Sequence, residues 1–383
     1  MAAQVVVLGA GVGGTLTANL LAKEIGEQAN IKLIDPTGNH VYQPGFLYLA
    51  LGQAKAKNLS LNEDRLLRDE IEVVRHGAEA IDIDPRQVRL DNGTSIAYDY
   101  LVIATGSRIV PEEVPGFEGA HHFYSMEGAE HLHSALEEFQ GGRILIGVAG
   151  IPYKCPPAPV EFSFMLEEHL THQGLRDRSS VTLLSPLNRA FTIESASKLV
   201  QPLMEERGIE LETFFNVETV EPGKKIVNSL EGESREYDLL VLVPPHRGQL
   251  IVDTSGIGDA GGWIPTDQHT LQLLRDGKPL DNVYVIGDAT DIPISKSGST
   301  AHFQSYVVAE RISAAVKEKA SADGHYNGRV MCFLETGYGK ATALQFDYDH
   351  PPEPPTPSRH WHMGKWMFNR MYWVTVPQGR VPV

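Results

Sequence analysis

Cys155 and Cys332 are the only two cysteines in this chain of 383 residues. Cys155 lies in a proline-studded segment, Lys154–Glu161, and Cys332 lies in an apolar run far along the chain. No Cys-x-x-Cys pair or histidine cluster has the spacing of a metal site. The two thiols are therefore either unrelated buried apolar groups or a redox pair that the fold brings together.

Glu161 follows Cys155 within the same segment. A carboxyl group can shuttle protons when its pocket raises its pKa toward neutrality. The alternative is a first-turn carboxylate that only favours the helix dipole. We expect the catalytic residues to be Cys155, Cys332 and Glu161, without a metal.

A strand, a glycine turn and a helix near the N-terminus predict a dinucleotide site. Gln4–Leu8 is an apolar run typical of a doubly buried parallel strand, and the Gly-x-Gly-x-x-Gly turn of Gly9–Gly14 follows at once. Such glycines permit a tight turn and close approach of a pyrophosphate, which the helix N-terminus attracts. Asp35, after a second expected strand, can accept hydrogen bonds from a ribose. The residues expected to bind the dinucleotide here are Gly9, Ala10, Gly11, Gly13, Gly14 and Asp35.

Two later segments resemble signatures of FAD-binding flavoproteins. Tyr98–Ser107 and Asn282–Thr290 are similar to the Ala-Thr-Gly and Gly-Asp motifs of the disulfide reductase superfamily. The resemblance implies FAD as the cofactor and a discontinuous FAD domain formed by residues 1–108 and 253–320. The further residues that it assigns to FAD are Ala78, Ala104, Thr105, Gly106, Gly287 and Asp288.

Residues 109–252 repeat the alternation of strand and helix, which predicts a second Rossmann-like domain carrying Cys155. Its expected elements are strands at 143–146 and 181–184 and helices at 160–172 and 199–207. Its first turn, Gly147–Cys155, lacks the three-glycine pattern and has Pro152 where N–H groups should meet phosphate. We therefore predict an α/β fold with two Rossmann-like domains, the second degenerate and without a seat for NADH.

Nearly the whole chain resembles the sulfide:quinone oxidoreductases, and also the flavin subunit of flavocytochrome c sulfide dehydrogenase. Lys154–Glu161 is similar to a Lys-Cys-x-Gly-Ala-Pro-x-Glu segment, with Pro157 in place of the usual glycine. Cys332–Phe333 resembles the second cysteine region, and Pro293–Gly298 resembles a Pro-x-x-Lys-Thr-Gly segment that approaches the flavin. The resemblance adds Lys296 and Gly298 to the FAD contacts and assigns Phe333 to quinone.

The resemblance implies oxidation of sulfide to zero-valent sulfur, with two electrons passing through FAD to a membrane quinone. Hydrosulfide would open a Cys155–Cys332 disulfide or short sulfur bridge, leaving a persulfide on one cysteine and a thiolate on the other. By resemblance Cys332 faces the flavin and Cys155 carries the sulfur, although the sequence leaves the opposite polarity open. Many relatives have a third cysteine, which this chain lacks, and Val41–Pro44 offers no cysteine to tether the flavin. We expect non-covalent FAD.

Composition restricts the partners and the location. The formal net charge of −16 repels phosphate backbones, so no nucleic-acid partner is expected. No signal peptide is expected, because the sequence shows neither a charged n-region nor a cleavage site. In the C-terminal region, residues 321–383, a proline-rich linker at 349–358 precedes a basic and aromatic segment at 359–383.

This last segment predicts an amphipathic helix that lies on the cell membrane. Met363, Trp366, Met367 and Met371 share one helical face, and the apolar run is too short to span a bilayer. The alternative is a terminal helix that packs against its own core or a partner. A homo-oligomer would align several such anchors on one plane.

Four other functions stay open at this level. A flavocytochrome-type subunit would pass single electrons to a haem protein, and an NADH:quinone oxidoreductase would need the second glycine turn. A reductase of small persulfides or disulfides would use the same cysteines. A flavin-containing redox sensor would need a partner surface and no turnover.

Overall fold

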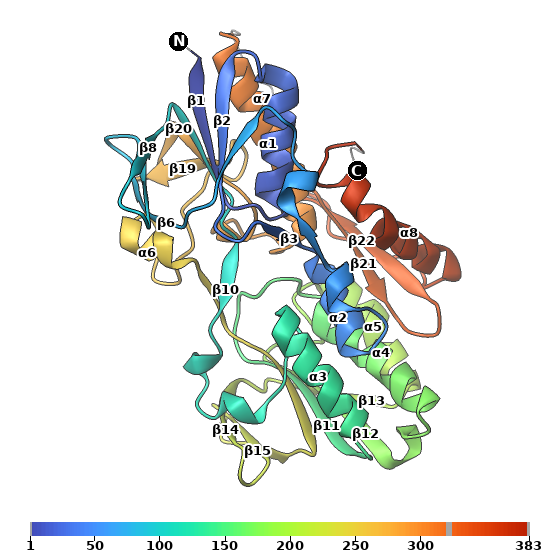
Figure 1. The fold of residues 1–383 in the computed structure, drawn as a ribbon. Helices are drawn as coiled ribbons and strands as arrows, with labels where there is room; N and C mark the ends of the chain where they lie inside the picture. Colours follow the sequence, from blue (N-terminus) through green and yellow to red (C-terminus); the bar gives the residue numbers. More distant parts are fainter. Residues whose placement is uncertain (1, 319–323, 381–383) are drawn as a thin grey trace.

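The computed structural model describes residues 2–318 and 324–380. The first body is built on a six-stranded sheet in the order β19-β20-β9-β1-β2-β5, parallel except for the pair of β19 and β20. The strands are β1 (Ala3–Leu8), β2 (Ala29–Ile34), β5 (Ile71–Val74), β9 (Tyr100–Ile103), β19 (Gln272–Arg275) and β20 (Lys278–Val285). Helices α1 (Val12–Ile25) and α7 (Gly298–Val316) pack side by side on this sheet (Figure 1).

Both faces of this sheet are buried. Side chains alternate along β1, so its successive residues pack into the cores on the two faces. Val5 and Val7 pack with α1 and α7, whereas Val6 and Leu8 pack into a cluster on the opposite face. The elements that cover this second face are β6 (Ala78–Asp82), β7 (Gln87–Leu90), β8 (Ser95–Ala97) and α6 (Leu250–Ser255). The predicted doubly buried strand is confirmed, and with it the α/β fold.

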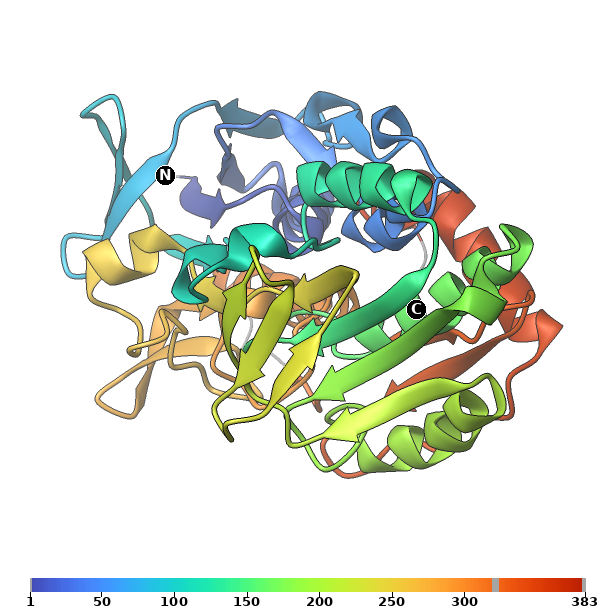
Figure 2. The same ribbon diagram turned by 90° about the horizontal axis from the view of Figure 1, so that it is seen from below.

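The second body repeats this design with a four-stranded parallel sheet in the order β13-β12-β11-β17. The strands are β11 (Gly142–Val148), β12 (Ser179–Ser185), β13 (Ile209–Thr213) and β17 (Leu239–Val243). One face carries the helices α3 (Met126–Glu138), α4 (Ala158–His172) and α5 (Glu194–Glu206). The other face carries a small sheet of β14 (Val217–Glu221), β15 (Ile226–Ser229) and β16 (Ser234–Glu236), seen from below in Figure 2.

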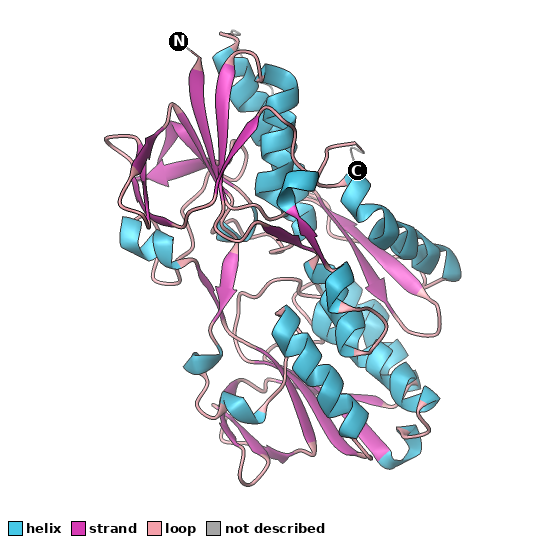
Figure 3. Ribbon diagram, viewed as in Figure 1, coloured by secondary structure: helices cyan, strands magenta, loops and turns pink. Residues whose placement is uncertain are grey.

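Several short elements join the two bodies (Figure 3). Where the chain passes between them, β10 (Ser107–Ile109) pairs antiparallel with β18 (His246–Gly248). A hairpin of β21 (Val330–Glu335) and β22 (Ala341–Phe346) leads to the last helix, α8 (Arg359–Thr375). The elements β3 (Asn39–Val41), β4 (Ser60–Asn62) and α2 (Phe46–Ala50) complete the junction. Hairpin, α2 and α8 share one apolar core with the second body, so the C-terminal region binds the two bodies together.

Some element bounds differ from the sequence prediction. Helix α4 begins at Ala158, two residues before the expected start, and α5 begins at Glu194 instead of 199 because polar residues of its first turn hid its start. The proline-rich segment has no regular structure over 350–357, but it is packed on the protein. Ser195 Oγ donates to Pro352 O (2.5 Å) and Thr342 Oγ1 to Pro355 O (2.6 Å).

Helix α8 packs on its own core by one face, as the alternative interpretation of the C-terminal segment predicts. Lys365 and Tyr372 on that face, and Val376 just after the helix, are buried, whereas the predicted apolar face is exposed. The large apolar side chains exposed on it are Met363, Trp366, Met367, Met371 and Val374. Across residues 2–318 and 324–380, no helix is long and apolar enough to cross a bilayer.

Candidate active site

The Gly9–Gly14 turn brings backbone segments close together and leaves an open position at Gly11, at the start of α1. Gly9 has a φ of 91°, and a Cβ on it would lie 2.7 Å from the Ala104 carbonyl oxygen. A Cβ on Gly14 would lie 1.7 Å from the Gly9 carbonyl oxygen, whereas a Cβ on Gly11 would meet nothing within 4 Å. Gly13 packs against Ile286. The first turn of α1 contains no acidic side chain, so its N–H groups present an unopposed positive end to an anion.

Polar groups around this turn fit a dinucleotide. Asp35 Oδ2 accepts a hydrogen bond from Ala10 N (3.0 Å), which brings the carboxylate to the turn; Oδ1 accepts from Thr37 N and Oγ1, so Oδ2 keeps the lone pair left for a ribose. The Thr105 backbone lies beside Gly9, and its side-chain hydroxyl is buried without a partner among the described residues. Gly106, which follows it, has a φ of 67° and open space at its Cβ position. Ala78 begins β6, directly after β5.

The segment between β20 and α7 forms the far side of the same site. Asp288 Oδ2 accepts a hydrogen bond from Ser107 Oγ (3.3 Å), and the Gly287 N–H donates to Gln304 Oε1 (2.6 Å). Lys296 Nζ donates to the carbonyl oxygens of Asp288 (3.0 Å) and Thr290 (2.7 Å). Gly298 is the first residue of α7, whose first turn contains no acidic side chain. These residues therefore fit a cofactor such as FAD, with a second helix N-terminus aimed at the site.

Cys155 is held in the loop that follows β11. Its backbone has a φ of 55°, a conformation that non-glycine residues rarely adopt. Its N–H donates to Lys296 O (2.7 Å) and its carbonyl oxygen accepts from Ala158 N (2.9 Å), so the loop is fixed both to the nucleotide-binding body and to α4. The half-buried thiol thus lies at the seam of the two bodies.

Cys332 on β21 approaches the same seam. Both thiols are free and pack against the same apolar core. Burial, and then the neighbouring Cys332, raises the pKa of the Cys155 thiol well above its usual range. Burial raises the pKa of Cys332 to about 11, opposed by a hydrogen bond with the Ser297 side chain. The fold therefore brings the two cysteines together, and both thiols are protonated at neutral pH.

Glu161 lies in the first turn of α4, close to both thiols, and is buried. Lys365 of α8 donates a hydrogen bond to its Oε1, and the lysine is buried as well. Burial raises the pKa of Glu161, opposed by the Lys365 charge, whereas the carboxylate keeps the pKa of Lys365 above its usual range despite burial. Lys365 belongs to the basic C-terminal segment, yet its side chain points into the protein instead of into solvent.

A second carboxylate extends this buried network toward the surface. Glu335 on β21 is buried, and its Oε1 accepts a hydrogen bond from the Tyr48 hydroxyl (3.3 Å). Its Oε2 lies 2.9 Å from Nδ1 of His362, a partly exposed residue of α8. The Lys365 ammonium lies over the Tyr48 ring, 5.6 Å from its centroid. Tyr48, Glu335 and His362 were missed in the sequence because nothing local links them.

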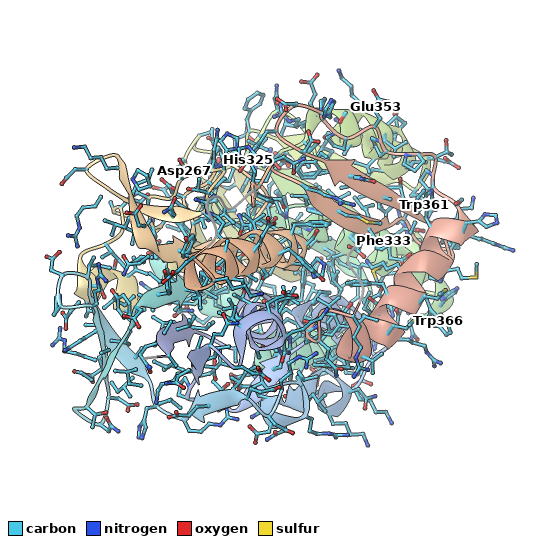
Figure 4. The ribbon with its side chains drawn as sticks, turned by 90° about the horizontal axis from the view of Figure 1, so that it is seen from above. Asp267, His325, Phe333, Glu353, Trp361 and Trp366 are labelled. Carbon is cyan, nitrogen blue, oxygen red and sulfur yellow. The ribbon has the colours of Figure 1, made fainter. Side chains whose placement is uncertain are left out.

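Phe333 lies under α8. A Cβ on Gly364 would be 3.6 Å from the Phe333 ring, and the ring centroids of Trp361 and Phe368 lie 6.4 and 6.3 Å from that of Phe333. Figure 4 shows Phe333 and Trp361 on the hairpin side of α8 and Trp366 on the outer side. Successive strand residues point to opposite faces, so Phe333 and Cys332 lie on opposite sides of β21.

The turn after β11 differs from the Gly9–Gly14 turn, as its sequence predicted. Pro157 caps α4 and Pro159 stands in its first turn, so two of the N–H groups that would meet a phosphate are missing. A cavity of about 190 Å³ adjoins this turn and is lined by Gly150, Pro152 and His246 among others.

Comparisons with known proteins were made with this geometry in hand. A family model described as pyridine nucleotide-disulphide oxidoreductase matches residues 3–318. The mitochondrial sulfide:quinone oxidoreductase of Mus musculus is 28% identical over 91% of this chain and 79% of its own length. The sulfide-quinone reductase of Aquifex aeolicus is 28% identical over 96% of this chain and 88% of its own length. The X-ray structure of the Aquifex aeolicus sulfide:quinone oxidoreductase matches with a TM-score of 0.88 and 26% identity, covering 100% of this chain and 93% of that one.

Proposed function

The chain belongs to the pyridine nucleotide-disulphide oxidoreductase family, and we propose that it is a sulfide:quinone oxidoreductase within that family. It oxidises hydrosulfide to zero-valent sulfur and passes the two electrons to a membrane quinone. One observation carries the proposal: the only two cysteines of the chain pack against one apolar core, close enough for Cys332 to raise the pKa of Cys155, and the Cys155 loop is hydrogen-bonded to the segment that fits FAD. The similarity to two sulfide-oxidising relatives over more than nine-tenths of this chain supports it.

The cysteine pair supplies the electrophilic sulfur. In the oxidised enzyme Cys155 and Cys332 form a disulfide or short sulfur bridge. Hydrosulfide forms a new S–S bond to Cys155 while the bond to Cys332 breaks, so Cys155 becomes a persulfide and Cys332 a thiolate. The sulfide sulfur is oxidised, and the electron pair resides on Cys332.

FAD binds non-covalently, because Tyr42 and its neighbours at Val41–Pro44 provide no thiol to tether it. The Gly9–Gly14 turn and the start of α1 would hold its pyrophosphate, Asp35 would hold a ribose, and Lys296 and the start of α7 would hold its ring system. The bound cofactor would supply an acceptor for the electron pair of the thiolate and a donor for quinone. The loop of Cys155 contributes by its two backbone hydrogen bonds, which fix the sulfur against this segment.

Glu161 and Lys365 take part in proton transfer. Reduction of a quinone to a quinol takes up two protons, and the buried pair connects Glu161, near the thiols, to α8, which carries Lys365. Glu161 is the proton donor or acceptor, and Lys365 balances its charge. Phe333, on the α8 side of β21, contacts the quinone.

The exposed face of α8 lies on the membrane surface. Its apolar side chains would enter the interface, and Arg370, which stacks over Trp366 at 4.5 Å, would meet anionic headgroups. The enzyme is then a peripheral membrane protein, and lipid-dissolved quinone reaches Phe333 beneath the same helix.

An anaerobic flavin titration tests the proposed function. Hydrosulfide alone should bleach the oxidised-flavin absorbance of the purified protein, and a short-chain quinone should restore it. NADH in a parallel cuvette should leave the absorbance unchanged. Bleaching by NADH alone would favour an NADH:quinone oxidoreductase, and bleaching by neither donor would reject sulfide as the substrate.

A further inference from the structure

A second buried carboxyl group lies close to the pair of Glu161 and Lys365. It belongs to Glu335 on β21, which is 4% exposed. Burial lowers the pKa of Lys365, but both carboxyl groups lie close enough to its ammonium to raise that pKa above its usual range. One buried ammonium thus serves two buried carboxyl groups. Because an uncompensated buried charge is costly, Glu335 needs a proton or a further cation.

Glu335 faces the proposed quinone side of β21. Alternate residues of a strand point to the same face, so Glu335 lies on the face of Phe333 and opposite that of Cys332. Helix α8 covers this face, because Gly364 meets the Phe333 ring and His362 meets the Glu335 carboxylate. Residues two apart along a strand are about 7 Å apart. A quinone held against Phe333 is therefore within reach of the Glu335 carboxyl group.

The two oxygens of Glu335 have different partners. Oε1 accepts a hydrogen bond from the buried-side hydroxyl of Tyr48 (3.3 Å), and Oε2 lies 2.9 Å from Nδ1 of His362. Burial raises the pKa of Tyr48 to about 12, so its hydroxyl keeps its proton at neutral pH. Tyr48 is therefore a fixed donor to Oε1, and the carboxyl group exchanges protons through Oε2.

His362 connects Oε2 to solvent. The His362 side chain is 40% exposed, whereas that of Glu335 is 5% exposed. Imidazole has two nitrogens that bind and release protons separately, and it is the side chain best suited to exchange protons with water near neutral pH. His362 can therefore bind a proton at Nε2, the nitrogen remote from Glu335, and release another from Nδ1 to the carboxylate.

We propose that His362 and Glu335 form a proton relay that delivers the second proton of quinol formation from solvent. Two electrons reach the quinone through the cofactor, one proton comes from Glu161, and the other comes from Glu335. Glu335 then takes the Nδ1 proton of His362, which binds a proton from water at Nε2. Two protons are needed because each carboxyl group holds one. This inference rests on the proposed function and adds two residues to it.

The test follows the oxidative half-reaction alone. Holoenzyme reduced with hydrosulfide is mixed anaerobically with a saturating short-chain quinone, and the return of the flavin absorbance is recorded. His362→Asn keeps a hydrogen-bond donor near the Nδ1 position but relays no proton, so it should slow the return about 100-fold. Imidazole added to the buffer should restore most of the lost rate. Glu335→Gln should be equally slow and should not respond to imidazole.

The reductive half-reaction separates this role from a general loss of structure. Both variants should keep their flavin content and the wild-type rate of bleaching by hydrosulfide, because β21 turns Glu335 away from Cys332. His360→Asn is the matched control, because His360 is an exposed histidine of the same helical turn and contacts no carboxylate among the described residues. It should keep the wild-type rate of return.

Three results would overturn the relay while leaving the function intact. They are a wild-type rate of return in both relay variants, equal slowing in His360→Asn, and a slow His362→Asn that imidazole leaves slow. A wild-type flavin that hydrosulfide does not bleach, or that quinone does not restore, would instead overturn the proposed function, and the relay with it.

Discussion

Lys365 of α8 is ion-paired with Glu161 of α4, and both side chains are buried. The pair joins the helix that carries the exposed apolar face to the helix that follows the Cys155 loop. A buried charge that loses its partner is costly, so this contact couples the position of α8 to the interior of the site. Helix α8 therefore contributes both an exposed apolar face and a buried charge beside the site.

Lys365→Met should destabilise the protein by about 3–5 kcal/mol, because it leaves Glu161 buried and unpaired. Burial already raises the pKa of Glu161, and losing the lysine raises it further. A carboxyl with a raised folded pKa favours the fold when protonated and loses that contribution as pH rises through the folded pKa. The deficit, measured by urea unfolding, should therefore grow as pH rises above the ordinary carboxyl range. Adding Glu161→Gln should recover most of the loss and flatten the pH dependence; a double variant as unstable as the single one would contradict a coupled pair.

Cys332 in the dithiothreitol-reduced protein should react slowly with iodoacetamide at neutral pH. With a pKa of about 11, about 0.01% of the thiol is thiolate at pH 7, against about 3% for a free cysteine. The alkylation rate, followed by mass spectrometry, should rise about tenfold for each pH unit up to about pH 10. A rate that levels off by about pH 9, where free cysteine does, would show an unperturbed thiol.

Gly14→Ala should abolish flavin binding. The new Cβ would lie 1.7 Å from the Gly9 carbonyl oxygen, so the turn and α1 must move apart. The ratio of flavin absorbance to protein in the purified variant should fall by about tenfold or more. Gly223→Ala is the control, because its Cβ would meet nothing within 4 Å, and it should keep full flavin content.

Trp366→Gln with Met367→Gln should weaken binding to vesicles of phosphatidylcholine and phosphatidylglycerol by about 10-fold to 100-fold. Both side chains are about half exposed on the outer face of α8, so the fold should survive. Phe214→Gln with Leu230→Gln removes two apolar groups of the second body that are even more exposed, and it should leave sedimentation with vesicles unchanged. Equal losses in both variants would indicate a non-specific effect of surface hydrophobicity.

The parts of the molecule that could be predicted are those encoded by local spacing. The Gly-x-Gly-x-x-Gly spacing between a strand and a helix predicts a tight turn with close backbone packing, and Gly9–Gly14 forms such a turn. The exposed face of α8 follows from the helical spacing of Met363, Trp366 and Met371, because side chains three and four residues apart share a face.

The parts that escaped prediction depend on contacts between distant segments. Lys365 lies on the helical face opposite Met363, a position that could have suggested burial. Only the fold shows that its partner there is Glu161. The proline-rich segment, which composition predicts to be a stiff, extended linker, is hydrogen-bonded to α5 and β22.

The most direct test of the account replaces each cysteine in turn. Cys155→Ser and Cys332→Ser holoenzymes, mixed anaerobically with hydrosulfide, should keep their flavin content but lose bleaching of the flavin band by at least about 1,000-fold in rate, since covalent catalysis needs both sulfurs. Retention of rapid bleaching in either variant would contradict the proposed role of the pair.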